Sequence, residues 1–142
     1  MLQTDLERYA NAPAVLVQIY VDRIVLHYPS STEYLTECAQ FSHPRSLLGD
    51  FSIAETTLTQ LLKRGGGGFK YLAPYMFIQA MERMEFGLTQ VEIRALQELG
   101  LNSGARAIAI YDETGKLLTP NSLPAPINLK RIAIMGLIVA SI

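Results

Sequence analysis

The stretch AVLVQIYVDRIVLHY at residues 14–28 constrains the fold most, because β-branched and aromatic residues fill it on both sides of one polar pair. Such side chains favour extended strands, and a polar pair between two such runs is typical of a hairpin turn. We predict two strands, from Ala14 to Tyr20 and from Ile24 to Tyr28, that turn at Asp22 and Arg23. The chain therefore builds a sheet from its first apolar segment onward.

A helix is predicted from Ser52 to Leu62. Ser52 and, three residues later, Glu55 form a capping box, which satisfies free backbone N–H groups at a helix start. The apolar residues of this segment that share one helical face are Ala54, Leu58, Leu61 and Leu62. The glycines that follow are expected to end the helix.

A second helix is predicted from Leu88 to Leu99. Thr89 and Glu92 form another capping box at its start, and Gly100 is the expected stop. The apolar stripe that should face the core consists of Val91, Ala95 and Leu99.

Two segments allow more than one structure. In PSSTEYLTECAQFSHPRS, a short helix from Thr32 to Ala39 is one interpretation of a mixed connection. In residues 75–86, a helix and a strand from Tyr75 to Met81 are both open, and periodicity favours the helix. The helical stripe of that segment would consist of Phe77, Ala80, Met81 and Met84.

The remaining apolar runs complete an α/β pattern. ARAIAIYDE at residues 105–113 predicts a strand followed by a turn at DETGK, and a last strand is predicted from Arg131 to Ala140. Strands separated by helical segments indicate an α/β fold with a mixed sheet and flanking helices. With 142 residues, we expect a single domain over 1–142 that has a proper hydrophobic core.

Composition argues against several classes of protein. Twelve basic and thirteen acidic side chains nearly cancel, so no whole-chain charge favours nucleic acid or an anionic membrane as a partner. Cys38 is the only cysteine, which excludes an intrachain disulfide and a cysteine-based zinc site. His27 and His43 have no partner at metal-ligand spacing. We expect no metal and no cofactor.

Targeting signals are not apparent in the sequence. The N-terminal MLQTDLERYA lacks the apolar segment of a secretory signal. The longest apolar run, IAIMGLIVASI, is shorter than the roughly 20 residues needed to span a bilayer. We expect a cytoplasmic protein without a transmembrane segment.

The run KRGGGGFK at residues 63–70 has the composition of a phosphate-binding loop but not its position. Such a loop follows a strand and opens a helix, so that backbone N–H groups meet the phosphate. Here the glycines follow a helix, and no Ser or Thr follows the lysine. We interpret the run as a flexible connection, with Lys63 and Arg64 as cations that oppose the helix dipole.

The stretch TQVEIRALQELGLNSGARAIAIYDE, residues 89–113, resembles the bacterial actin-like rod shape-determining protein family (MreB). That family has Thr-Gln-Val-Glu, then Arg-Ala, a later Glu, and Gly-Ala-Arg before a strand that ends in an acidic pair. The matching residues are Thr89, Gln90, Val91, Glu92, Arg94, Ala95, Glu98, Gly104, Ala105 and Arg106. Asp112 and Glu113 fall at the acidic pair.

A second match lies upstream, in HPRSLLGDFSIAETTLTQLL. The residues that match the family there are Pro44, Gly49, Asp50, Phe51 and Glu55. The resemblance implies a reduced form of the first domain of an actin-like (ribonuclease H-like) ATPase, whose first hairpin is residues 14–28. It also implies that YMFIQA is a strand, with the residues ERME bulging before residues 86–87, and we accept the strand.

The chain departs from this family where nucleotide would bind. Actin-like ATPases hold phosphate groups with two glycine-containing hairpins, of the Asp-x-Gly-Thr and Asp-x-Gly-Gly-Gly-Thr types. Here the first position reads LVQIYVDR, without Gly-Thr, and the second would fall beyond IAIMGLIVASI. We therefore expect a degenerate nucleotide-binding site and no ATP hydrolysis.

The expected function is that of a non-catalytic, rod-shape-related protein. It would bind a component of the cytoskeleton or of cell-wall elongation, or associate with itself through exposed sheet edges. One alternative is an actin-like ATPase that completes its cleft by oligomerisation, with Asp112 and Glu113 positioning the attacking water. Another is a small-ligand sensor domain of unrelated α/β fold. Because folds do not fix functions, these alternatives stay open at this stage.

Overall fold

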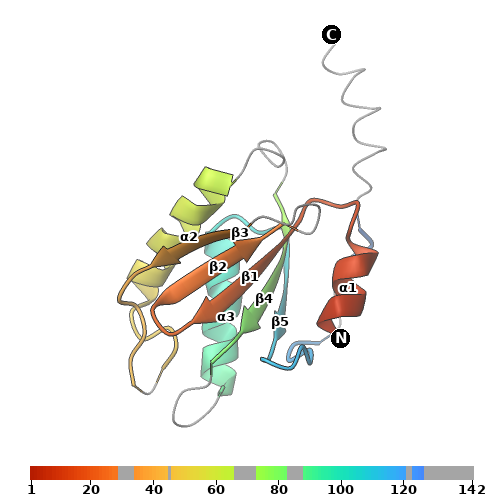
Figure 1. The fold of residues 1–142 in the computed structure, drawn as a ribbon. Helices are drawn as coiled ribbons and strands as arrows, with labels where there is room; N and C mark the ends of the chain where they lie inside the picture. The colour runs from red at the N-terminus through yellow and green to blue at the C-terminus, as the bar shows by residue number, and fades with distance from the viewer. Residues whose placement is uncertain (29–33, 45, 66–72, 83–87, 121–122, 127–142) are drawn as a thin grey trace.

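The computed structural model describes residues 1–28, 34–44, 46–65, 73–82, 88–120 and 123–126. Within these ranges the elements, in chain order, are α1 (Leu2–Arg8), β1 (Ala14–Tyr20), β2 (Arg23–His27), β3 (Tyr34–Cys38), α2 (Phe51–Gly65), β4 (Tyr75–Ala80), α3 (Gln90–Asn102) and β5 (Ala107–Tyr111). Figure 1 shows them with the same labels.

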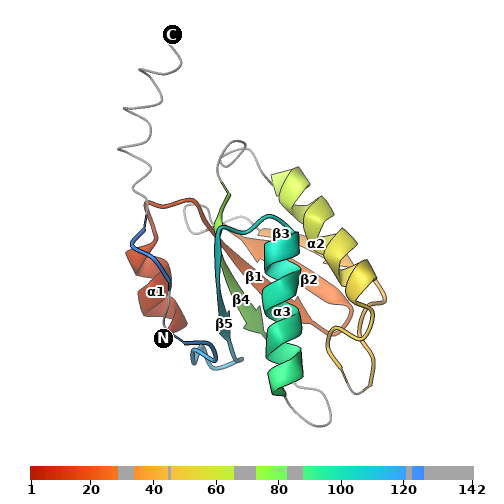
Figure 2. The same ribbon diagram turned by 180° about the vertical axis from the view of Figure 1, so that it is seen from behind.

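The strands form one five-stranded mixed sheet in the order β3-β2-β1-β4-β5. β2 runs antiparallel to both of its neighbours, whereas β1 and β4 are parallel, as are β4 and β5. Helices α2 and α3 lie together on one face of this sheet, which is seen from the helix side in Figure 2. The predicted α/β fold with a mixed sheet and flanking helices is confirmed.

Two apolar clusters stabilise the sheet from its two faces. The larger one joins alternate residues of the central strands, such as Val17 and Ile78, to Leu58 of α2 and Leu96 of α3. The smaller one lies on the other face, where Tyr9 beyond the end of α1 packs against aromatic residues of β4 and β5. The rings of Tyr9 and Tyr75 are 4.9 Å apart. The residues buried in this second cluster are Leu2, Tyr9, Ala12, Ala14, Tyr75, Phe77, Ala109 and Tyr111.

Several predicted elements are found in the structure. The hairpin is present as β1 and β2, and the strand at YMFIQA is confirmed as β4. All six residues of β4 are buried, because it lies inside the sheet with a helix or chain segment on each face. A fully buried strand shows no alternation of apolar and polar residues, which explains why periodicity favoured a helix.

The short helix predicted from Thr32 to Ala39 is wrong, because Tyr34–Cys38 is the edge strand β3. It pairs with β2 over five successive residues without a bulge. Its burial alternates, and Leu35 packs against the larger cluster while Tyr34 is exposed. Pairing with β2 therefore outweighs the weak local preference of this segment.

The predicted N-cap of α2 is also wrong. The helix begins at Phe51, and the backbone N–H of Ile53 donates to the carboxylate of Asp50 over 3.2 Å. Asp50 therefore caps the helix in place of Ser52, and an aspartate accepts such a bond as well as a serine does.

Helix α3 differs from the prediction at its stop and on its apolar face. It continues past Gly100 to Asn102, and Gly100 is buried where an added Cβ would lie 2.5 Å from the side chain of Ile108. Gly100 is therefore needed for close packing on β5 rather than for ending the helix. Val91, which the predicted stripe placed in the core, is 78% exposed, and Leu96 is buried instead.

Three predictions fall outside the described residues. They are the strand from Arg131 to Ala140, most of the glycine run, and the bulge at ERME before residues 86–87. Gly65, the first glycine of the run, is the last residue of α2. Among the described helices, none is long and apolar enough to cross a bilayer.

Candidate functional site

The carboxyl ends of the three parallel strands β1, β4 and β5 lie side by side at one end of the sheet. Gln79 pairs with Tyr111 and Ile19 with Ala80, so the segments after these strands are neighbours. In sheets of this kind, ligands bind beyond the carboxyl ends of the strands. The acidic pair Asp112 and Glu113 follows β5 directly, which makes this end the first place to examine for chemistry.

Asp112 has a structural role in the turn at residues 112–116. Its Oδ1 accepts bonds from the backbone N–H groups of Thr114 and Lys116, each over 2.9 Å, and from the Thr114 hydroxyl over 2.5 Å. The side-chain amide of Gln79 donates to the carbonyl oxygens of Asp112 and Glu113. Asp112 is 6% exposed, so this oxygen holds the turn and is not directed at solvent.

The β1–β2 turn, for which the resemblance to MreB implies a phosphate hairpin, is held by side chains of other segments. The backbone N–H of Val21 donates to the carboxylate of Glu82, the second residue after β4. Asp22, whose φ is 53°, exchanges two hydrogen bonds with Ser42, from its own N–H at 3.0 Å and to its Oδ1 at 2.7 Å. The turn groups that could meet a phosphate are therefore bonded to side chains of the protein.

The acidic residues that the structure describes at this end of the sheet include Asp22, Glu82, Asp112 and Glu113. Their charges disfavour a triphosphate, which carries negative charge itself. No group of three or more metal-binding side chains is found within the described ranges. At this end of the sheet, the N–H groups of the β1–β2 turn and the Oδ1 atom of Asp112 are therefore hydrogen-bonded within the protein.

A polar row crosses the sheet face opposite α2 and α3. Gln79 Oε1 accepts from Gln18 Nε2 over 3.0 Å, and Gln18 Oε1 lies 2.7 Å from His27 Nε2. Because Gln18 presents its oxygen to the imidazole, Nε2 of His27 carries the proton of that bond. Partial burial lowers the pKa of His27 below its usual value.

The first half of the MreB-like motif forms the start of α3. Thr89 is the N-cap, and its hydroxyl accepts from the Glu92 N–H over 3.2 Å. The Glu92 carboxylate does not return this bond to Thr89; its Oε1 accepts from the backbone N–H of Leu47 over 3.2 Å. Glu92 is 8% exposed, and its Oε2 has no hydrogen-bond partner among the described residues. The predicted capping box is therefore half formed, and Glu92 holds the segment before α2 against α3.

The second half of the motif aligns β5 with β4. Gly104 has a φ of 104°, which glycine adopts without strain, and Ala105 N–H donates to the carbonyl of Gly100. Arg106 donates from its backbone to Pro74 over 2.8 Å and from its side chain to Ala73 over 3.0 Å. These matching residues therefore have structural roles.

The remaining motif residues lie on the outer surface of α3. Gln90, Val91, Arg94 and Glu98 are exposed, whereas Ala95 packs partly against the core. Within the described chain, neither the Arg94 guanidinium nor the Glu98 carboxylate has a hydrogen bond or an ion pair.

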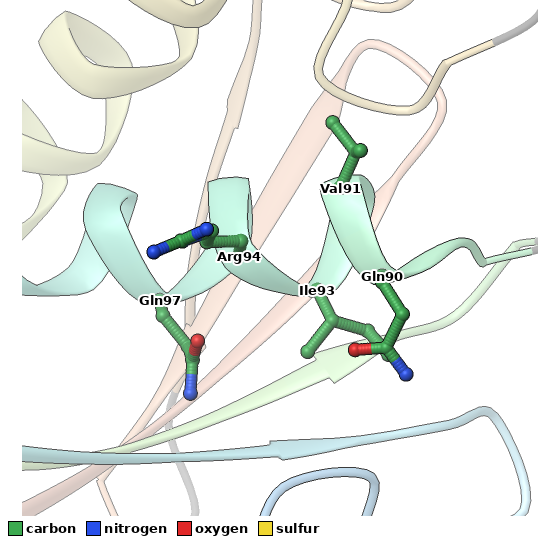
Figure 3. Close-up of a pocket in the computed structure, with 5 residues that line it drawn as sticks. All are labelled: Gln90, Val91, Ile93, Arg94 and Gln97. Atoms are coloured by element: carbon green, nitrogen blue, oxygen red, sulfur yellow. The ribbon is translucent and has the colours of Figure 1, made fainter.

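Two shallow hollows run along this surface. One, of about 280 Å³, is lined by Gln90, Val91, Ile93, Arg94 and Gln97. Figure 3 shows Val91 on one side of the helix there and Gln90, Ile93 and Gln97 on the other, with Arg94 between them. The second, of about 330 Å³, is lined by Arg94, Gln97, Glu98, Leu101 and Ile108. Arg94 and Gln97 belong to both, so the hollows adjoin.

Sequence reasoning missed the apolar part of this surface. Val91 and Leu101 are 78% and 55% exposed, although the amphipathic pattern placed Val91 in the core and made no use of Leu101. The spacing of Val91, Arg94, Glu98 and Leu101 contained the signal, because helix positions three and four apart share a face. We call these four residues the α3 stripe.

No protein-family model matches the chain, and no curated protein matches it in sequence.

Proposed function

We propose that this chain is a non-catalytic protein related to the rod-shape (MreB) family, acting in the cytoplasm, and that it associates with itself through the α3 stripe. The observation that carries the proposal is the self-complementary order of charged and apolar residues in that stripe. Cell shape is the process that the motif resemblance suggests.

The element order supports the actin-like part of the proposal. A hairpin is followed by helix, strand, helix and strand, here β1–β2, α2, β4, α3 and β5, with β3 between the hairpin and α2. This is the order that a reduced first domain of an actin-like (ribonuclease H-like) ATPase would have. The motif residues also fall on one helix, its N-cap and the connection that leads into the next strand, which is the order that the resemblance implies.

The carboxyl end of the sheet supports a non-catalytic role. The Val21 N–H is bonded to Glu82, and Oδ1 of Asp112 is committed to its own turn. A phosphate would have to displace one carboxylate and approach three others, which is electrostatically unfavourable. The same argument weighs against the ATPase alternative.

The α3 stripe is symmetric about position 96. Val91 and Leu101 lie five residues on either side of this position, and Arg94 and Glu98 lie two residues on either side. When two α3 helices pack antiparallel, Val91 of one copy meets Leu101 of the other, and Arg94 meets Glu98 twice. The contact is isologous, since the same surface is used by both copies.

The expected contact is weak. The stripe spans about 15 Å of helix, so it buries less than the roughly 1,200 Å² of a standard interface. Each exposed ion pair adds no more than about 1 kcal/mol and is screened by salt. We therefore expect a reversible dimer that dissociates on dilution and at high salt.

Sedimentation velocity at increasing protein concentration tests the proposal. Arg94→Glu should weaken association about tenfold or more, because two attractive pairs become repulsive. The double variant Arg94→Glu/Glu98→Arg should restore it, since the charges are exchanged and stay complementary. Lys63→Glu is the matched control, because it makes the same change of charge on an exposed position of α2.

Two results would overturn the α3 contact. One is association that Arg94→Glu leaves unchanged, and the other is a double variant that stays as weak as the single one. Circular dichroism of each variant should match that of the unchanged protein, which separates lost association from lost folding.

A further inference from the structure

The two edge strands of the sheet, β5 and β3, differ in how other residues cover their backbone groups. Beyond β5, Leu118 N–H donates to the Ile110 carbonyl over 2.8 Å, and the Thr119 hydroxyl accepts from Ile110 N–H over 3.4 Å. A bridge between Tyr111 and Leu117 continues this cover. No described residue covers β3 in the same way.

The backbone groups that β3 leaves unpaired follow from its register with β2. Ala39 N–H donates to the Asp22 carbonyl over 3.1 Å, so this pair is a hydrogen-bonded one. Such pairs alternate with non-bonded pairs in antiparallel strands. The pairs Arg23–Cys38, Val25–Thr36 and His27–Tyr34 are therefore non-bonded towards β2. The N–H and C=O groups of Tyr34, Thr36 and Cys38 point away from the sheet.

β3 also lacks the features that usually block an open edge. It has no proline, no lysine and no bulge. Glu37 is its only charged residue, and its carboxylate is paired with Arg64 of α2 over 2.5 Å. An incoming strand therefore meets no unpaired charge in β3.

We propose that β3 pairs with β3 of a second copy of this chain, antiparallel and with a two-fold axis at Thr36. Thr36 then lies opposite Thr36 of the other copy, and Tyr34 lies opposite Cys38 on each side. The three outward residues of each strand exchange hydrogen bonds, and Thr–Thr pairs in adjacent strands are favourable. Glu37 faces Leu35, so no like charges are directly opposed.

This contact deepens the proposed self-association, because α3 and β3 are separate surfaces. α3 lies over β4 and β5, whereas β3 is the opposite edge of the sheet, as Figure 2 shows. One copy can therefore use both contacts at once. If α3 and β3 contacts alternate, the assembly grows beyond a dimer. Growth beyond a dimer therefore depends on the proposed α3 contact, whereas pairing of β3 with β3 does not depend on it.

Cysteine crosslinking tests the register. In the Cys38→Ser background, Thr36→Cys places two thiols on residues about 5.5 Å apart between Cα atoms, within the range of a disulfide. Mild oxidation should give a covalent dimer of this variant. The unchanged protein should not crosslink, because its two Cys38 residues lie four positions out of register, about 14 Å apart. Equal crosslinking of the unchanged protein through Cys38, or no crosslinking of the Thr36→Cys variant, overturns the register.

Sedimentation separates the two contacts. Thr36→Lys places like charges opposite each other at the two-fold axis. It leaves the hydrogen bonds between β3 and β2 intact, because the backbone N–H and C=O groups of Thr36 point away from β2. We expect the unchanged protein to exceed a dimer as its concentration rises, Thr36→Lys and Arg94→Glu each to stop at a dimer, and their combination to stay monomeric.

Each failure has its own pattern. If Arg94→Glu alone gives monomers, the β3 contact is absent while the α3 contact stands. If Thr36→Lys alone gives monomers, the α3 contact is absent while the β3 contact stands. If Thr36→Lys leaves the sedimentation profile unchanged, the β3 proposal is overturned. Thr36→Pro removes the outward N–H without adding a charge, so it should reproduce the effect of Thr36→Lys if that variant acts by preventing strand pairing.

Discussion

The carboxylate of Glu92 accepts a hydrogen bond from the backbone N–H of Leu47, 45 residues earlier in the chain. Both residues are buried, and Leu47 is fully so. The bond fixes the start of α3 against the segment before α2. A residue of the MreB-like motif thus stabilises the fold, although its neighbour Val91 faces solvent.

Removing this carboxylate should destabilise the protein. Glu92→Ala leaves the Leu47 N–H buried without an acceptor, which should lower the free energy of unfolding by about 1–3 kcal/mol. Glu92→Gln keeps a carbonyl oxygen at this place and should cost less than about 1 kcal/mol. Urea unfolding at low protein concentration measures both. Glu7→Ala, an exposed change on α1, is the control, and a loss in Glu92→Ala no larger than this control would contradict the role.

The hydroxyl of Tyr111 donates to the Asp5 carboxylate over 2.5 Å and joins β5 to α1. Burial and this bond raise the pKa of Tyr111. Tyr111→Phe keeps the buried ring and removes only the bond, so we expect a loss of about 1 kcal/mol, since the half-buried Asp5 regains water. Amide hydrogen exchange should accelerate in α1 and not in α3. The control is Tyr20→Phe, because the Tyr20 hydroxyl has no hydrogen bond within the described residues. This variant should change neither the stability nor the exchange rates.

The lowered pKa of His27 predicts a pH dependence of stability. A base whose folded pKa lies below its unfolded value, near 6.5, binds fewer protons when folded. Its contribution is therefore fully present above that pH and is lost as the pH falls through the lower folded pKa. The stability difference between the unchanged protein and His27→Gln should shrink between pH 7.5 and pH 5. A difference that stays constant across this range in urea unfolding would rule out the titration of His27 as the cause.

Much of the sheet was predictable because its signals are local. The hairpin of β1 and β2 is a dense run of strand-forming residues around a turn, and the N-cap Thr89 precedes its helix directly. β3 was not predictable from its own residues. Leu35 is its only residue packed on the core, and three of its five side chains face solvent. Its strand structure comes from β2, through contacts between segments.

The place of the α3 surface was predictable from the sequence, but the residues that it exposes were not. The motif pointed to α3, yet which motif residues face solvent depends on how the helix rotates on the sheet. Close packing of Gly100 against Ile108 sets that rotation and turns Val91 outward. The bond between Val21 and Glu82 joins residues 61 positions apart, so no local pattern reveals it.

Adding ATP with magnesium should not stabilise the protein. The backbone N–H of Val21 is bonded to Glu82, and Asp22 is bonded to Ser42, so the β1–β2 turn has neither a glycine nor an available backbone N–H donor for a phosphate. A ligand present at 100 times its Kd adds about 2.7 kcal/mol to the free energy of unfolding. For a domain of this size, that corresponds to a rise in Tm of roughly 5–10 °C.

Thermal unfolding with increasing Mg-ATP therefore distinguishes the non-catalytic proposal from the ATPase alternative. We expect Tm to stay constant with ATP, and also with ADP and with magnesium alone. A rise of about 5 °C or more with ATP, absent with magnesium alone, would show a nucleotide site and contradict the proposal. In that case Asp112→Asn would be the decisive variant, because it keeps an oxygen for the turn while removing the charge. Lost hydrolysis at unchanged Tm would then assign a catalytic role to Asp112. Unchanged hydrolysis would show that Asp112 only stabilises the turn.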